Sequence, residues 1–158
     1  MVAGATFVIL IDNNVLVQLL TDRVASDKLS AYLQQENTLL LIPTPVLAEF
    51  LAYDYSQRYI KFFSTMQNSR SQIVPFDQKT AIICGQLACE LRKTKESATS
   101  KQKVKVDLQI VAIALAMKVK KILTEDTDIA DIISSLDLKQ LDVITIADLP
   151  KGLPLFDS

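Results

Sequence analysis

Short apolar runs that alternate with helix-like segments constrain the fold of this chain most strongly. The first run, residues 7–11, contains only large apolar residues, which is typical of a strand buried on both faces of a sheet. Further runs occur at residues 38–42, 73–74, 122–124 and 143–146. Because strands that alternate with helices form βαβ units, we expect an α/β fold with a mostly parallel central sheet of about five strands and helices on both faces.

Capping residues and apolar spacing predict where the helices lie. One helix is expected at residues 28–35, with Ser26 or Asp27 as its N-cap, because the polar stretch 22–27 interrupts the preceding helix. Asp77 is expected to cap a long helix that runs to about residue 92. The other helices are predicted at residues 14–20, 46–53, 56–66, 108–117 and 129–134.

The chain length and composition predict one domain. It has 158 residues, of which 49% are hydrophobic, so it can bury a sizeable core. We expect a single domain over residues 1–158, with its core at 7–146 and a C-terminal tail at 147–158. No apolar run reaches the roughly 18 residues of a membrane span, and the first residues carry no positive charge typical of a signal peptide. A cytoplasmic protein without a membrane segment is therefore expected, with Cys84 and Cys89 as buried free thiols.

The residue types that are missing exclude several chemistries. The chain has no histidine, which removes the Ser-His-Asp and Cys-His triads and almost any ordinary zinc site. It has three glycines and no glycine-rich phosphate loop. The net charge of −1 gives the whole protein no general attraction for nucleic acid. Any metal must therefore be held by oxygen atoms, which favours Mg²⁺ or Mn²⁺.

Four carboxylates are predicted to converge at one edge of the sheet. Asp12 and Asp126 each follow an apolar strand directly, while Glu49 and Asp107 lie near the beginnings of helices. In parallel α/β sheets these positions meet at the carboxyl ends of the strands. Like charges brought that close are unstable unless a cation lies among them, so the set predicts a divalent-metal site.

Each acid also has a simpler structural explanation. Asp12 and Asp107 could each cap the helix that follows, and Asp126 or Asp128 could cap the helix after the fourth strand. Glu49 lies within the apolar segment VLAEFLAY, where it could instead pair with a basic side chain or point outward.

Four segments contain these acids in order along the chain: ILIDNNVL, TPVLAEFL, KVDLQIVAIALAMK and ILTEDTDI. Together they resemble the motifs of the PIN-domain ribonucleases, in particular the toxins of VapBC-type toxin–antitoxin pairs. The chain departs from the family at Asn13, where a small hydroxyl residue is common, and at Ile129, where an aromatic residue is common. The resemblance covers about residues 7–146 and implies a single PIN-like domain. It maps the four family acids onto Asp12, Glu49, Asp107 and Asp126.

The resemblance implies hydrolysis of RNA phosphodiester bonds with one or two Mg²⁺ or Mn²⁺ ions. Asp12 and Asp107 would be the firmest ligands, and Glu49 and Asp126 would complete the site. Asn14, Thr124 and Asp128 would support these ligands, and Asp128 is close enough to Asp126 to replace it as the fourth acid. The family also implies an antitoxin protein as a partner and, commonly, a homodimer.

The stretch 92–105 is polar and basic, and we expect a loop there. From their position and charge, Lys103 and Lys105 are candidate contacts for the RNA backbone.

Two other classes of function remain open. The first is an inactive PIN-like module that binds RNA or protein. The second is another acid-cluster enzyme, such as a phosphatase or a receiver-like domain, although Asp12-Asn13-Asn14 lacks the second acid of an Asp-x-Asp phosphatase motif. Metal binding separates the first from the nuclease, and activity on small phosphorylated substrates separates the second.

Overall fold

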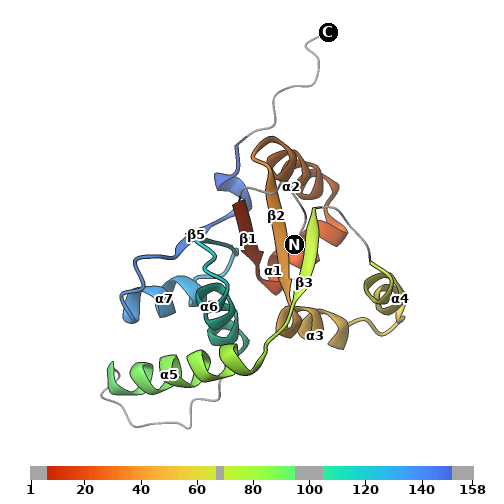
Figure 1. The fold of residues 1–158 in the computed structure, drawn as a ribbon. Helices are drawn as coiled ribbons and strands as arrows, with labels where there is room; N and C mark the ends of the chain where they lie inside the picture. The colour runs from red at the N-terminus through yellow and green to blue at the C-terminus, as the bar shows by residue number, and fades with distance from the viewer. Residues whose placement is uncertain (1–6, 67–69, 95–104, 151–158) are drawn as a thin grey trace.

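The computed structural model describes residues 7–66, 70–94 and 105–150. Its parallel five-stranded sheet has the order β3-β2-β1-β4-β5, which places β1 at the centre (Figure 1). The predicted α/β fold with a parallel sheet is thereby confirmed. The strands are β1 (Phe7–Ile11), β2 (Thr38–Pro43), β3 (Ser71–Val74), β4 (Lys121–Leu123) and β5 (Asp142–Ile144).

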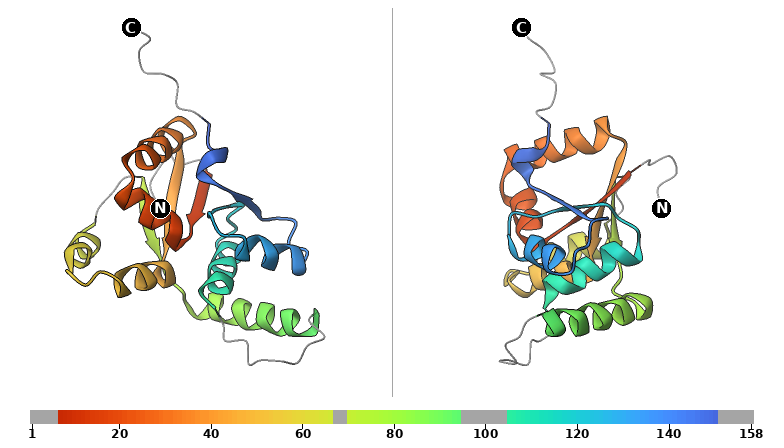
Figure 2. Two further views of the ribbon diagram at one scale, coloured as in Figure 1. Left: turned by 180° about the vertical axis from the view of Figure 1, so that it is seen from behind. Right: turned by 90° about the vertical axis from the view of Figure 1, so that its left-hand side faces the viewer.

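Helices connect the strands and lie on both sides of the sheet. Figure 2 shows α1 and α2 on one side and α6 on the other, with α5 packed along α6. The helices of the described residues are α1 (Asn13–Thr21), α2 (Arg23–Gln35), α3 (Thr44–Ala52), α4 (Arg58–Ser64), α5 (Gln78–Thr94), α6 (Val106–Ala116), α7 (Asp128–Ser135) and a short 3₁₀ helix, η1 (Ile146–Asp148).

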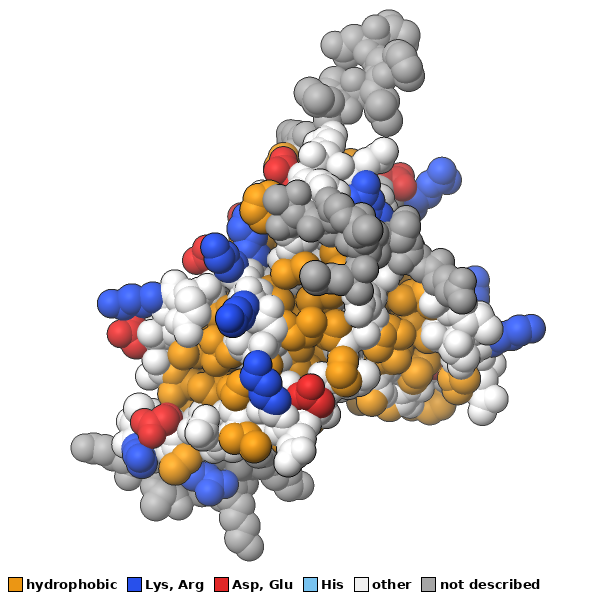
Figure 3. Space-filling model, in the orientation of Figure 1, with side chains coloured by type: hydrophobic (Ala, Val, Ile, Leu, Met, Phe, Trp, Pro, Cys, Tyr) orange, Lys and Arg blue, Asp and Glu red, His pale blue; other side chains and the backbone are white. Residues whose placement is uncertain are grey.

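The core lies around the central strands and α6. The side chains of β2 are all buried, and most of those of α6 are too, so this helix has no polar face. An apolar helix of this kind can lie only inside a protein or a membrane. Within the described ranges, no helix combines the length and hydropathy that crossing a bilayer requires. On the face shown in Figure 3, hydrophobic side chains gather over the sheet, and acidic side chains are dispersed.

The predicted start of one helix was wrong, because a different residue caps it. The helix predicted at residues 28–35 begins at Arg23, because Asp22 rather than Ser26 or Asp27 is its N-cap. The Asp22 side chain accepts hydrogen bonds from the backbone N–H groups of Val24 (2.9 Å) and Ala25 (3.3 Å). These bonds satisfy donors that a helix start leaves free.

Two further expectations need correction. Both cysteines are free thiols, but only Cys84 is buried, and Cys89 is exposed on α5. The helix expected to begin at Leu108 begins at Val106, so Asp107 lies inside its first turn and does not cap it. An acidic residue in this turn still faces the positive end of the helix dipole.

Candidate functional site

Asp12 directly follows β1, and its side chain is only 5% exposed. Its backbone N–H donates to the carbonyl oxygen of Leu123 in β4 (3.1 Å), so this position continues the pairing of the two strands. Its Oδ1 atom accepts from the backbone N–H of Asn13 (2.6 Å), which makes Asp12 the N-cap of α1. The capping role and the position at the edge of the sheet therefore coexist in one residue. A buried carboxylate is stable only with such partners.

A small hydrogen-bond network joins Asp12 to the loop after β4. The Thr124 hydroxyl donates to Asp12 Oδ2 (2.9 Å) and accepts from the backbone N–H of Asp126 (3.1 Å). The Asn14 amide nitrogen lies 3.4 Å from both Asp12 Oδ2 and Thr124 Oγ1. The Asn14 amide oxygen accepts from the backbone N–H of Glu125 (3.1 Å). The structure thus brings Asp12, Asn14 and Thr124 together and fixes the start of the acidic loop.

Asp107 is half-buried in the first turn of α6. Burial is the largest cause that raises its pKa from the ordinary value of 3.8 to about 6. The other causes are the negative charges, in decreasing order of effect, of Asp12, Asp128, Asp126 and Glu49. Every charge that raises this pKa is negative, so the acids predicted to converge share one electrostatic environment around Asp107.

Glu49 is half-buried on α3, one turn from its C-terminus and not near its beginning as expected, because this helix already begins at Thr44. Burial raises its pKa, and the negative charge of Asp12 raises it further. The Glu49 carboxylate therefore lies near Asp12 in an environment that disfavours its charged form. A glutamate turned fully toward water would not have this raised pKa.

Asp126 and Asp128 are both exposed in the segment that leads into α7. The Asp126 Oδ1 atom accepts from the backbone N–H of Asp128 (3.1 Å), so the first acid helps to shape the turn that presents the second. Of the two, Asp128 has the larger effect on the pKa of Asp107. Both therefore remain candidates for the fourth acid.

The structure describes one of the two lysines that were predicted to contact RNA. Lys105 is exposed at the N-cap position of α6, two residues before Asp107. Lys103 lies outside the described residues.

The donor set of this site suits a hard divalent cation. Its charged groups are carboxylates, which Mg²⁺ and Mn²⁺ prefer over sulfur or nitrogen ligands. Among the described residues, no three acidic or cysteine side chains are already arranged around a single ion position. Binding would therefore require rotation of exposed side chains such as Asp126 and Asp128.

Glu125, in the acidic loop, is a residue whose role the sequence alone does not indicate. Its Oε1 atom accepts from the backbone N–H of Ile146 (2.8 Å), and the backbone N–H of Thr124 donates to the carbonyl oxygen of Ile144 (3.0 Å). Glu125 therefore anchors the acidic loop to the chain beyond β5. Its position inside ILTEDTDI was the only sequence feature that pointed to it.

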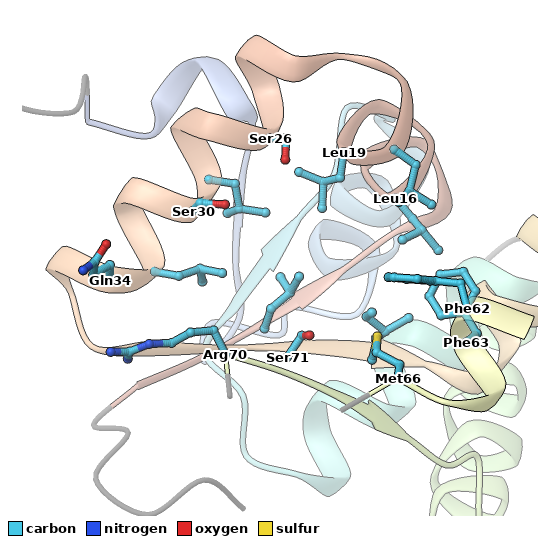
Figure 4. Close-up of a pocket in the computed structure, with 15 residues that line it drawn as sticks. Leu16, Leu19, Ser26, Ser30, Gln34, Phe62, Phe63, Met66, Arg70 and Ser71 are labelled. Atoms are coloured by element: carbon cyan, nitrogen blue, oxygen red, sulfur yellow. The ribbon is translucent and has the colours of Figure 1, made fainter. Parts of the chain in front are cut away.

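One cavity lies away from the acids. It has a volume of about 390 Å³ and lies between α1, α2, α4 and the edge of the sheet (Figure 4). Its walls are mainly leucine side chains, Phe62, Phe63 and Met66, with Ser26, Ser30 and Ser71 at intervals. None of the acids around Asp107 lines it. Its lining therefore offers no means of binding a metal ion or activating water.

Comparisons with known proteins give a family and a set of similar folds. The model of the PIN domain matches residues 9–133. The structure of VapBC2 from Rickettsia felis bound to a DNA fragment from its promoter contains a chain that is 20% identical, with a TM-score of 0.61. That match covers 88% of this chain and 98% of the other.

Two further solved structures have similar folds. VapBC-1 from nontypeable Haemophilus influenzae contains a chain that is 18% identical, with a TM-score of 0.61, and the match covers 90% of this chain and 100% of that one. A toxin–antitoxin complex from Klebsiella pneumoniae contains one that is 20% identical, with a TM-score of 0.57 and coverages of 87% and 96%. No functionally curated protein matches the chain.

Proposed function

Because the chain belongs to the PIN-domain family, we propose that it is a nuclease that hydrolyses RNA phosphodiester bonds with Mg²⁺ or Mn²⁺. The observation that carries this proposal is the raised pKa of Asp107, which has four other carboxylates within electrostatic reach. The repulsion among these carboxylates destabilises the folded protein in the absence of a cation, and the same carboxylates can bind a cation when one is present.

The residues around Asp107 have distinct proposed roles. Asp12 and Asp107 would be the principal ligands, and Glu49 with Asp126 or Asp128 would complete the site. When bound, the ion would neutralise phosphate charge and lower the pKa of a coordinated water molecule. Thr124 and Asn14 hold the Asp12 carboxylate in one orientation through hydrogen bonds. Positioning of this kind preserves the geometry of a ligand.

Basic side chains near the site would bind the substrate. Lys105 precedes Asp107 by two residues and is exposed, so its ammonium group can approach a phosphate next to the acids. We propose the same role for Lys103. Contacts of this kind contribute affinity that falls with increasing salt and carries little sequence information.

The first experiment is cleavage of labelled RNA by the purified protein. We expect cleavage with Mg²⁺ or Mn²⁺, none with EDTA, and at least a hundredfold loss in the Asp12→Asn variant, because one principal ligand becomes neutral. The matched control is Asp27→Asn, which changes an exposed acid on α2.

Two results would contradict the nuclease proposal. Absence of both metal binding and cleavage would favour the inactive binding module. Release of phosphate from small phosphorylated substrates, without RNA cleavage, would favour a phosphatase. Metal binding is measured by calorimetry on the same preparations, so that each result can be assigned.

We further propose a protein antitoxin as a partner, the homodimer as the oligomeric state and the cytoplasm as the compartment. Support for the antitoxin comes from the fold shared with a chain of the Klebsiella toxin–antitoxin complex. The product of an adjacent gene that co-purifies with this chain and suppresses its RNA cleavage would support that role.

A further inference from the structure

A second cavity lies beside the acidic site, between α1, α3 and α4. Its volume is about 290 Å³, close to the lower end of the range for small-molecule sites, about 300–1,000 Å³. Asn13 and Phe50 line it, and they are the residues that directly follow Asp12 and Glu49. The same backbone segments that present two acids therefore also form a wall of this cavity. The remaining lining residues are Val17, Thr21, Tyr53, Asp54 and Tyr59.

Two tyrosines that differ in exposure, Tyr59 and Tyr53, line the cavity. The Tyr59 ring packs edge-on against Phe50, with ring centroids 5.2 Å apart, and is therefore fixed. The Tyr53 ring is 71% exposed at the end of α3. Single-stranded nucleic acids bind proteins by stacking their bases on such aromatic faces. Both rings line the cavity and offer aromatic surface on which a flat group can stack.

Polar atoms at the cavity suit a nucleobase better than an aliphatic side chain. Asn13 lines the cavity, and its Oδ1 atom is shielded from solvent and has no hydrogen-bond donor among the described residues, so a base could reach this oxygen only after the amide rotates toward the cavity. An asparagine amide offers both donor and acceptor atoms, which match the polar edges of bases. The Arg58 guanidinium lies 5.6 Å from the centroid of the Tyr59 ring and brings a positive charge to this side of the molecule. That charge can attract the phosphate attached to a bound base.

The Asp54 carboxylate, which also lines the cavity, does not exclude a nucleobase from it. Its carboxylate accepts hydrogen bonds from the backbone N–H groups of Arg58 (3.2 Å) and Tyr59 (2.8 Å) at the start of α4. Its oxygens are thus engaged in holding the α4 segment, which carries Tyr59, against α3.

We propose that this cavity receives one nucleobase of a single-stranded RNA whose neighbouring phosphate lies at the acidic site. The inference rests on the proposed nuclease function and specifies how its substrate is selected. Stacking on Tyr53 and Tyr59 accepts every base, whereas the Asn13 amide discriminates between their edges. The cavity therefore gives the enzyme a preference for the base next to the cleaved bond.

The test measures the binding of short fluorescein-labelled single-stranded RNAs and of matched RNAs with an abasic ribose at successive positions. The proteins carry Asp12→Asn in Mg²⁺ buffer, so that the probe is not consumed. We expect one abasic position to weaken binding by about 5- to 150-fold, as the loss of one stacked base does. Added Tyr53→Ala should remove most of this difference, and Tyr53→Phe should retain it.

A matched control exists two residues further along the chain. Tyr55 is 88% exposed and does not line the cavity, so Tyr55→Ala should bind intact and abasic RNA as the parent protein does. Added Asn13→Ala should change the order of affinities for RNAs that differ only in the base at the sensitive position. Circular dichroism spectra of all variants show whether they remain folded.

Three outcomes separate this inference from the proposed function. Equal binding of intact and abasic RNA, or equal effects of Tyr53→Ala and Tyr55→Ala, would overturn the base site even if the unmodified protein cleaves RNA. Such a result would favour a partner protein as the molecule that occupies the cavity. If the unmodified protein neither binds nor cleaves RNA, both proposals fail. Cleavage together with a Tyr53-dependent base effect supports both.

Discussion

Thr124 uses its single hydroxyl group twice at the acidic site. The side chain is 1% exposed, donates to Asp12 Oδ2 and accepts from the backbone N–H of Asp126. One hydroxyl therefore fixes both an acid at the end of β1 and an acid in the loop after β4. Strand periodicity alone predicts a buried residue here. The family resemblance implied that Thr124 supports the metal ligands, but its hydrogen bond to Asp12, across 112 positions of the chain, is visible only in the structure.

Replacement of Thr124 by valine tests this double role. Valine has a similar shape but cannot form either hydrogen bond, so Thr124→Val should lower the free energy of unfolding by about 1–3 kcal/mol. RNA cleavage should fall as well, because Asp12 loses a fixed orientation. Urea denaturation and the cleavage assay measure the two effects. Thr127→Val, at an exposed position of the same loop, should change neither by much. A fully stable and active Thr124→Val protein would contradict the role.

At the scale of elements, Asp22 joins two helices. Its backbone N–H donates to the carbonyl oxygen of Gln18 (2.7 Å) at the end of α1, and its side chain caps α2. Asp27, which the sequence suggested as the cap, lies inside α2 with its carboxylate 3.9 Å from Arg23 in an exposed pair. Several polar residues in one stretch can all cap a helix, so the sequence does not select among them.

The two aspartates should respond differently to alanine. Asp22→Ala leaves helix N–H groups without an acceptor and should destabilise the protein by about 0.5–2 kcal/mol. Asp27→Ala removes only an exposed ion pair and should change stability by less than about 0.5 kcal/mol. Urea denaturation of the two variants side by side gives the comparison. A larger effect at Asp27 would show that the helix start is wrongly assigned.

The sequence predicted the elements well and their ends less well. The run at residues 38–42 forms a fully buried strand as expected, whereas in the run at residues 7–11 only the last three residues are buried and Phe7 is exposed. The prediction that Asp12, Glu49, Asp107 and Asp126 form one metal site, which still has to be tested, followed from the expected ends of strands and beginnings of helices. The cavity beside Asn13 did not, because its walls come from three helices whose mutual packing has no sequence pattern.

At the scale of the whole molecule, the raised pKa of Asp107 makes stability depend on pH. Asp107 has a pKa of about 6 in the folded protein and an ordinary value of 3.8. Between these values the folded protein retains a proton that the unfolded chain has lost. The contribution of Asp107 to stability is therefore largest below about pH 4 and is lost as the pH rises through 6. A divalent cation that binds the folded state offsets this loss.

Asp107→Asn should remove this pH dependence. In EDTA at about pH 7.5, the variant should be more stable than the unmodified protein by about 1 kcal/mol, a value reduced from the full linkage because the carboxyl group is partly exposed. At about pH 3, below the ordinary pKa of 3.8, the two proteins should be nearly equally stable, because the aspartate is then protonated in both the folded and the unfolded state and is neutral like asparagine. Urea denaturation at both pH values measures the difference. Asp142→Asn, at an exposed position on β5, is the control. A less stable Asp107→Asn protein at the higher pH would contradict the account.

The central place of β1 has a consequence for synthesis on the ribosome. The strand that carries Asp12 is made first, yet its partner β4 and the hydroxyl of Thr124 follow 112 residues later. At about 5–20 residues per second, roughly 6 to 22 s of translation separate these two residues. During that interval the nascent chain carries Asp12 without the hydroxyl that orients it. The acidic site can be assembled only after Thr124 has been synthesised.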